Sequence, residues 1–201
     1  RYMSGNQVGG NSFWKVLNML NTKYIIHMQK DNKPGVMVNP DAFGNAWIVS
    51  NIDWVTTPNE EIAAIENTNV KTTAIVNEEF KNVVGDFNPS VSKGTIQLTS
   101  YKPNELIYNF NSSKEELVVF SEIWTSKGWT MWIDGEESPL IRADYILRAA
   151  VVPAGNHEIK MRYEPKIWKV GNTIQFISSL ILILGLLAAI FVTYKKSVSK
   201  Q

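Results

Sequence analysis

The sequence has no cysteine and only two histidines among its 201 residues. Without thiols the chain can form neither a disulfide framework nor a thiolate zinc site, and it has no cysteine nucleophile. A metal site needs His and acidic residues clustered at ligand spacing, and neither His27 nor His157 has such neighbours. We therefore predict no metal and no cofactor.

Catalytic motifs are also absent from the sequence. There is no Gly-rich phosphate-binding loop, no Gly-x-Ser-x-Gly elbow and no recognisable Ser/His/Asp set. Asp134 and Asp144 are candidates for a pair of catalytic carboxylates, but both fit better as turn residues. His157 lies on the apolar face of its predicted strand, which favours a packed or hydrogen-bonded histidine over a ligand or base. We expect no catalytic residue in this chain.

The first 166 residues have no excess of positive charge. They hold all 19 acidic and 16 of the 20 basic residues, a net charge of −3, whereas residues 167–201 carry +4. A slightly acidic body without a basic stripe argues against nucleic acid as a partner.

One long apolar run is present near the C-terminus. No charged residue occurs from Val170 to Tyr194, which is longer than the roughly 20 residues that a helix needs to cross a bilayer. Aromatic and basic residues typical of membrane interfaces flank this run: Trp168, Lys169, Tyr194, Lys195 and Lys196. A buried core helix is the alternative, but such a helix rarely runs this long without a polar stripe. We predict a transmembrane helix over residues 167–195 and a basic tail over 196–201.

Residues 1–90 show a mixed pattern of helices and strands. Apolar spacing predicts a helix over 11–20, and Thr57-Pro58 followed by acidic residues predicts the start of a second, short helix. Asp31–Gly35 has the composition of a turn. Strands are predicted over residues 23–28, 45–50, 52–56 and 73–76. We interpret this part as a mixed α/β region.

Residues 91–166 alternate between apolar and polar with a period of two. Trp129, Met131 and Ile133 share one face of a strand that ends at Asp134-Gly135, a strong hairpin signal. Seven short strands separated by turns predict a β-sandwich of the jelly-roll type. The chain as a whole is thus predicted to be mainly β, with a small mixed α/β part and one C-terminal transmembrane helix.

Three tryptophans close together in the sequence suggest a sugar-binding platform. Indole faces stack on pyranose rings, and nearby Arg and Asp side chains supply polar contacts. By alternation Trp129 and Trp132 point to opposite faces of their strand, so only part of the set can share a surface, and core packing is the alternative. The candidate glycan contacts are Trp124, Trp132, Asp134, Arg142 and Asp144.

An ordered set of short motifs runs through the chain. It comprises Phe120-Ser-Glu122, Gly128-Trp129, Asp134-Gly135, Arg142-Ala-Asp144, Arg148, Val152-Pro-Ala-Gly155-x-His157, Tyr163-Glu-Pro165 and Gly171. In this order they resemble the C-terminal end of the YfhO family of bacterial membrane proteins. Leu17-Asn-Met-Leu-Asn-Thr-Lys-Tyr24, Asn39-Pro40 and Gly44-Asn-Ala-Trp47 resemble the preceding region of Bacteroidetes-type members.

The resemblance implies a polytopic protein of glycosyltransferase C-type architecture that uses a lipid-linked sugar donor at the outer face of the cytoplasmic membrane. In Gram-positive members it implies glycosylation of cell-wall polymers such as lipoteichoic acid. It also implies that residues 1–166 are extracytoplasmic (periplasmic) and that the C-terminus is cytoplasmic, an orientation that charge counting alone leaves open because Arg162, Lys166 and Lys169 lie at the other end of the span. Such enzymes keep their catalytic acidic residue in N-terminal spans, so no catalytic residue is transferred to this chain.

We therefore expect the C-terminal piece of a larger membrane protein, whose body positions a cell-surface glycan acceptor or caps an active site held upstream. The expected partners are the lipid bilayer, the upstream transmembrane region of the parent protein and a cell-envelope glycan or lipid-linked sugar. A structural or protein-interaction module without sugar contact is the alternative, and a free-standing enzyme is the least favoured reading.

Overall fold

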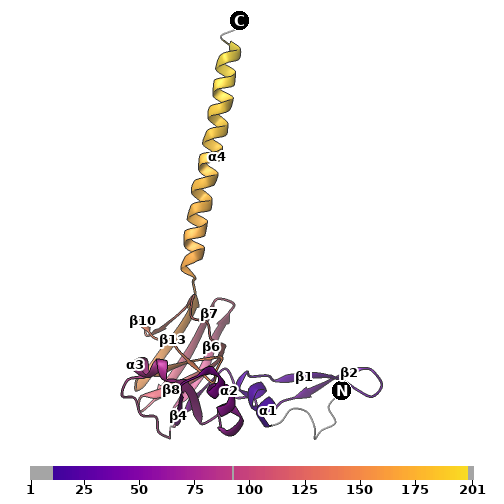
Figure 1. The fold of residues 1–201 in the computed structure, drawn as a ribbon, viewed down its shortest axis with the longest axis vertical. Helices are drawn as coiled ribbons and strands as arrows, with labels where there is room; N and C mark the ends of the chain where they lie inside the picture. The colour runs from indigo at the N-terminus through magenta and orange to yellow at the C-terminus, as the bar shows by residue number, and fades with distance from the viewer. Residues whose placement is uncertain (1–10, 92, 199–201) are drawn as a thin grey trace. The chain divides into compact units, whose positions relative to one another are not determined.

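The computed structural model describes residues 11–91 and 93–198 (Figure 1). The chain divides into two compact units, Arg1–Tyr163 and Glu164–Gln201. The first unit, called the body below, holds all the described strands, and the second holds one helix. The boundary predicted near residue 90 falls inside the first unit.

The described elements confirm a mainly β chain with a few helices and a C-terminal apolar helix. In chain order they are α1 (Asn11–Met19), β1 (Tyr24–Met28), β2 (Pro34–Val38), β3 (Ala46–Val49), β4 (Asn51–Val55), α2 (Pro58–Asn67), β5 (Thr73–Asn77), η1 (Glu78–Phe80), α3 (Lys81–Val84), β6 (Thr95–Lys102), β7 (Glu105–Ser112), β8 (Glu116–Ile123), β9 (Trp129–Ile133), β10 (Glu136–Ser138), β11 (Ile141–Ala143), β12 (Leu147–Val152), β13 (Gly155–Tyr163) and α4 (Lys166–Val198). Eight strands rather than seven follow residue 91, and β2 begins inside the segment predicted as a turn.

Two sheets face each other across a shared core. One is five-stranded and antiparallel, in the order β10-β9-β13-β7-β6, and the other is six-stranded, in the order β3-β8-β12-β11-β5-β4. Side chains from both sheets, including Tyr108, Phe120, Met131 and Ile159, form one buried cluster. The rings of Tyr108 and Phe120 meet edge to face with centroids 5.1 Å apart. This arrangement is the predicted β-sandwich.

The other face of the six-stranded sheet is covered by helices. Leu117 of β8 and Leu147 of β12 join a second buried cluster that also contains Met19 of α1 and Ile65 of α2. Residues 117–120 of β8 are therefore buried on both faces, which explains why all four are apolar. The body has three layers: sheet, sheet and helices.

The six-stranded sheet combines strands from before and after residue 90. β4 and β5 run parallel, as two strands joined by a crossover helix do, and α2 is that crossover. β3 pairs with β8, and β5 pairs with β11 through Val76 and Ala143. The mixed α/β segment and the sandwich thus contribute to one continuous sheet.

The predicted hairpin at Asp134-Gly135 is confirmed. Both residues have positive φ, 51° and 90°, and Ile133 pairs with Glu136 across the turn. Two central residues with positive φ define a type I′ turn, whose twist matches that of the flanking strands.

α2 begins with the predicted cap. The Thr57 hydroxyl oxygen accepts a hydrogen bond from the Glu60 amide (3.3 Å), and the Glu60 carboxylate accepts from the Thr57 amide (3.3 Å). We expect Thr57→Ala to lower the free energy of unfolding by about 1 kcal/mol, because it leaves the Glu60 amide without its acceptor. Denaturant titration followed by circular dichroism measures this loss. Asn59→Ala, at an exposed position of the same helix, is the control, and an equal effect of both variants would contradict the role of the cap.

α4 contains the predicted membrane-spanning segment. Its stretch Val170–Val192 has a mean hydropathy of 2.5 and is not buried within the structure. Trp168 and Lys195, two of the predicted interface residues, are exposed. The side chains of the other three predicted interface residues, Lys169, Tyr194 and Lys196, lie outside the described part of the chain.

Candidate functional site

The two tryptophans of β9 point to opposite faces of the sheet. Trp129 packs against the core cluster between the sheets together with Ile133. Trp132 lies on the other face, where its neighbours on the adjacent strands are Glu137 and Lys160. The alternation predicted from the sequence is confirmed, so these two indoles do not share a surface.

Asp134 fixes its turn to β13 through His157. Its Oδ2 lies 2.6 Å from His157 Nδ1, and its Oδ1 accepts from the Glu158 amide at 2.9 Å. His157 Nε2 lies 3.1 Å from the carbonyl oxygen of Ala154. The bond to His157, with help from the Glu158 amide, lowers the pKa of Asp134, and the same bond raises the pKa of His157. The interpretation of His157 as a hydrogen-bonded strand histidine is confirmed.

Arg142 and Asp144 belong to a buried ionic cluster with Glu61 of α2. Arg142 Nη2 lies 3.0 Å from Glu61 Oε1, and Glu61 is only 1% exposed. Asp144 is fully buried, and its Oδ1 accepts from the Ile75 amide at 2.9 Å. Burial raises the pKa of Asp144 to about 7, the Ile75 amide opposes the rise, and the nearby Glu61 adds to it. These contacts hold the β11–β12 turn against β5 and α2.

Asp134 and Asp144 therefore have different partners on different sheets. Each is a turn residue with positive φ, 51° and 49°. Carboxylates that act as a catalytic pair flank one reacting bond, and the contacts of these two show no such arrangement. Among the described residues, no group of three or more His, Asp or Glu side chains could hold a metal ion.

Trp124 and Trp129 come together at a hollow of about 190 Å³. Trp124 is held by an edge-to-face contact with Phe80, with ring centroids 5.8 Å apart. The other residues that line it are Thr125, Ser126, Thr130, Met131, Glu137, Ser138, Pro139 and Leu140. Ser138 is paired with Met131 and so shares the face of Trp129, whereas Glu137 is paired with Trp132 on the opposite face. We call this hollow the indole pocket. Trp124 is the candidate glycan contact that lines it; Trp132, Asp134, Arg142 and Asp144 are not among its lining residues.

A buried arginine supports the indole pocket from behind. Arg148 is 3% exposed, and its guanidinium carbon lies 4.1 Å from the centre of the Trp129 ring. Burial lowers the pKa of Arg148, and the charges of Glu122 and Tyr108 oppose this shift. Burial raises the pKa of Glu122, and the positive charge of Arg148 opposes that shift. This cation–π contact fixes the indole plane. Arg148 occurs among the sequence motifs, but no sequence pattern indicated that it would lie against Trp129.

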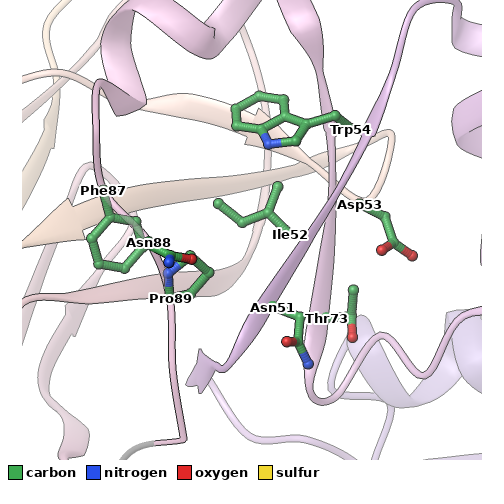
Figure 2. A pocket seen from close by; sticks show the side chains of 8 residues that line it. All are labelled: Asn51, Ile52, Asp53, Trp54, Thr73, Phe87, Asn88 and Pro89. Atoms are coloured by element: carbon green, nitrogen blue, oxygen red, sulfur yellow. The ribbon is translucent and has the colours of Figure 1, made fainter.

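A second hollow of about 390 Å³ opens beside β4 (Figure 2). Figure 2 shows Ile52 and Trp54 on the side of β4 that faces Phe87, and Asp53 on the opposite side. Asp53 is engaged there as an acceptor for the Thr68 hydroxyl at 3.0 Å. Ligand sites combine apolar walls with polar groups that converge on the same space, and these aromatic and acidic groups point apart. The indole pocket is the better candidate.

The described chain combines a β-sandwich body with one apolar helix long enough to cross a bilayer. A family model described as bacterial membrane protein YfhO matches residues 61–175, more than half of the chain. The chain belongs to this family, and the resemblance seen in its motifs is confirmed. No curated protein and no solved structure matches it.

Proposed function

We propose that the body is a non-catalytic accessory domain of a YfhO-like glycosyltransferase and that it positions a cell-surface glycan acceptor at the indole pocket. The observation that carries this proposal is that two fixed indoles, Trp124 and Trp129, line one hollow together with the hydroxyl-bearing residues Thr125, Ser126 and Ser138. Indoles supply large apolar faces for pyranose rings, and the polar rim suits sugar hydroxyls.

In this proposal α4 holds the body outside the cytoplasmic membrane, in the periplasm, and the basic C-terminus lies in the cytoplasm. The resemblance to the YfhO family is the basis for this orientation, because basic residues flank both ends of the span. The lipid-linked sugar donor and the catalytic acidic residue belong to upstream spans of the parent protein, whose active site the body would face or cap.

The test is isothermal titration of the full chain in lipid nanodiscs with a panel of cell-envelope glycan fragments. A glycan that binds is expected to lose about tenfold in affinity, roughly 1.4 kcal/mol, on Trp124→Ala. Trp132→Ala is the matched control because Trp132 lies on the face of β9 opposite to Trp129. We expect the Trp132→Ala chain to bind the glycan with the affinity of the unmodified chain.

Two other outcomes of this titration would redirect the proposal. Loss of binding with Trp132→Ala but not with Trp124→Ala would move the site to the outer face of the five-stranded sheet. No binding across the panel would favour a structural or protein-interaction module. In the parent protein, reduced sugar transfer by Trp124→Ala at normal membrane abundance supports acceptor positioning, whereas reduced abundance supports a structural role.

A further inference from the structure

β1 and β2 form a two-stranded sheet of their own, separate from both sheets of the sandwich (Figure 1). Their register places Tyr24 opposite Val38 and Ile26 opposite Val36, on one face of the hairpin. These four side chains are 63–74% exposed. Neither buried cluster, as far as the body is described, includes any of them.

The base of this hairpin is firmly attached although its apolar face is open. The Asn39 amide donates to the carbonyl oxygen of Lys23 at 2.8 Å, and Asn39 Nδ2 donates to Asn18 Oδ1 at 2.8 Å and to the Thr22 carbonyl oxygen at 2.9 Å. An isolated two-stranded hairpin is only marginally stable in water, and contiguous exposed apolar surface marks a contact site. The open face therefore requires a covering surface.

The charges around the hairpin are mostly positive. Lys23 precedes β1, and Lys30 and Lys33 lie in the loop between the strands, all three exposed. Asp31, which lies 3.2 Å from Lys33, is the acidic residue of that loop. Apolar side chains bordered by lysines match the interface of an anionic bilayer, where the apolar groups enter the acyl boundary and the ammonium groups meet the phosphates.

A bilayer is also the partner that the family and the apolar helix of this chain indicate. The chain belongs to a membrane protein family and carries a helix long enough to span the lipid. A contact made by a tethered domain is effectively intramolecular, so weak apolar and electrostatic terms suffice for it. We infer that the apolar face of the β1–β2 hairpin docks on the interface of an anionic lipid bilayer. This inference is independent of glycan binding at the indole pocket.

The absence of cysteine permits a clean test with single labels. Val36→Cys and Met37→Cys occupy adjacent positions on opposite faces of β2, and both side chains are exposed, 64% and 36%. Each full-length variant is labelled with an environment-sensitive fluorophore and reconstituted in vesicles of equimolar phosphatidylcholine and phosphatidylglycerol. We expect doxyl-labelled lipid to quench the label at position 36 several-fold more than the label at position 37.

The contribution of the lysines to bilayer docking is tested with a variant that combines Lys23→Gln, Lys30→Gln and Lys33→Gln, or with vesicles of phosphatidylcholine alone. Either change is expected to reduce the quenching at position 36 while near-ultraviolet circular dichroism stays unchanged. Equal lipid quenching at both positions, or accessibility of position 36 to aqueous iodide, would overturn the inference. Protection of position 36 from both quenchers would overturn it as well, because a protein surface, such as a second copy of this chain, would then cover the hairpin.

Discussion

Arg142→Met is expected to lower the free energy of unfolding of the body by about 3 kcal/mol, since removing one partner of a buried ion pair leaves the other charge uncompensated. The charge left without a partner is that of Glu61, whose side chain is 1% exposed and lies 3.0 Å from the guanidinium of Arg142. The partial exposure of Arg142, 21%, keeps the expected loss at the lower end of the range for such pairs. Its second partner, Glu79, is largely exposed and contributes little.

The matched control is Lys102→Met, which breaks an ion pair of similar length, 2.9 Å to Glu105, at a position where the lysine is 61% exposed. We expect a loss below about 1 kcal/mol there. Denaturant titration followed by near-ultraviolet circular dichroism reports on the packed tryptophans and measures both variants. Adding Glu61→Gln to Arg142→Met should recover part of the lost free energy of unfolding, because it removes the buried charge that has no partner. Equal losses for Arg142→Met and Lys102→Met would contradict a buried pair.

The stability of the body is expected to fall as the pH rises from about 4 to about 7 because of Asp144. Its pKa is about 7 in the folded chain and near 3.8 without the fold, so in this range the folded state holds a proton that the unfolded state has lost. At about 1.4 kcal/mol for each pKa unit, the contribution of Asp144 decreases by an amount on the order of 4 kcal/mol. Above that range both states are ionised and the slope ends.

Asp144→Asn isolates this contribution. Asparagine tolerates the positive φ of 49° at this turn position and keeps an oxygen that can accept from the Ile75 amide. Glu122 and His157, whose pKa values are also raised in the folded state, titrate in both proteins, so their effects cancel in the difference. The measurement is the free energy of unfolding at pH 4.5 and pH 7.5 for both proteins. The same slope with and without Asp144 would exclude it as the buried acid.

Features coded by neighbouring residues were predictable from the sequence. The Asp134-Gly135 turn, the Thr57 cap and the alternation along β9 each depend on a few adjacent side chains and a fixed backbone geometry, and the structure has all three. The apolar run of α4 could be recognised from its length and composition alone. Such local signals sufficed to predict a mainly β chain and an apolar helix long enough to span a membrane.

Features that depend on distant partners were not predictable. Pro34-Gly35 has turn composition, yet pairing with Met28 and His27 makes it the start of β2. Glu61 looked like an ordinary acidic residue of a first helical turn, but Arg142 reaches it from a position 81 residues away and it is buried.

The grouping of the candidate site residues also depends on distant partners. Trp124, predicted from the sequence as a glycan contact, lines the indole pocket, and the second indole there is Trp129 and not Trp132. Alternation placed Trp129 and Trp132 on opposite faces without showing which face is the core. Trp129 packs against the core cluster and also lines the pocket. The sequence does not show where a sheet edge leaves such a side chain half covered.

The continuous six-stranded sheet has a consequence for how the body folds during synthesis. Among the described strands, β3 has its only partner in β8, and β5, which pairs with β4 on one side, has its second partner in β11; both partners are synthesised much later. Pairing between strands so distant in the chain is slow, and unpaired strand edges invite aggregation meanwhile. Nascent chains halted near residue 90 should therefore need a chaperone, whereas a protease nick near that residue in the finished body should leave both fragments associated until denaturant separates them.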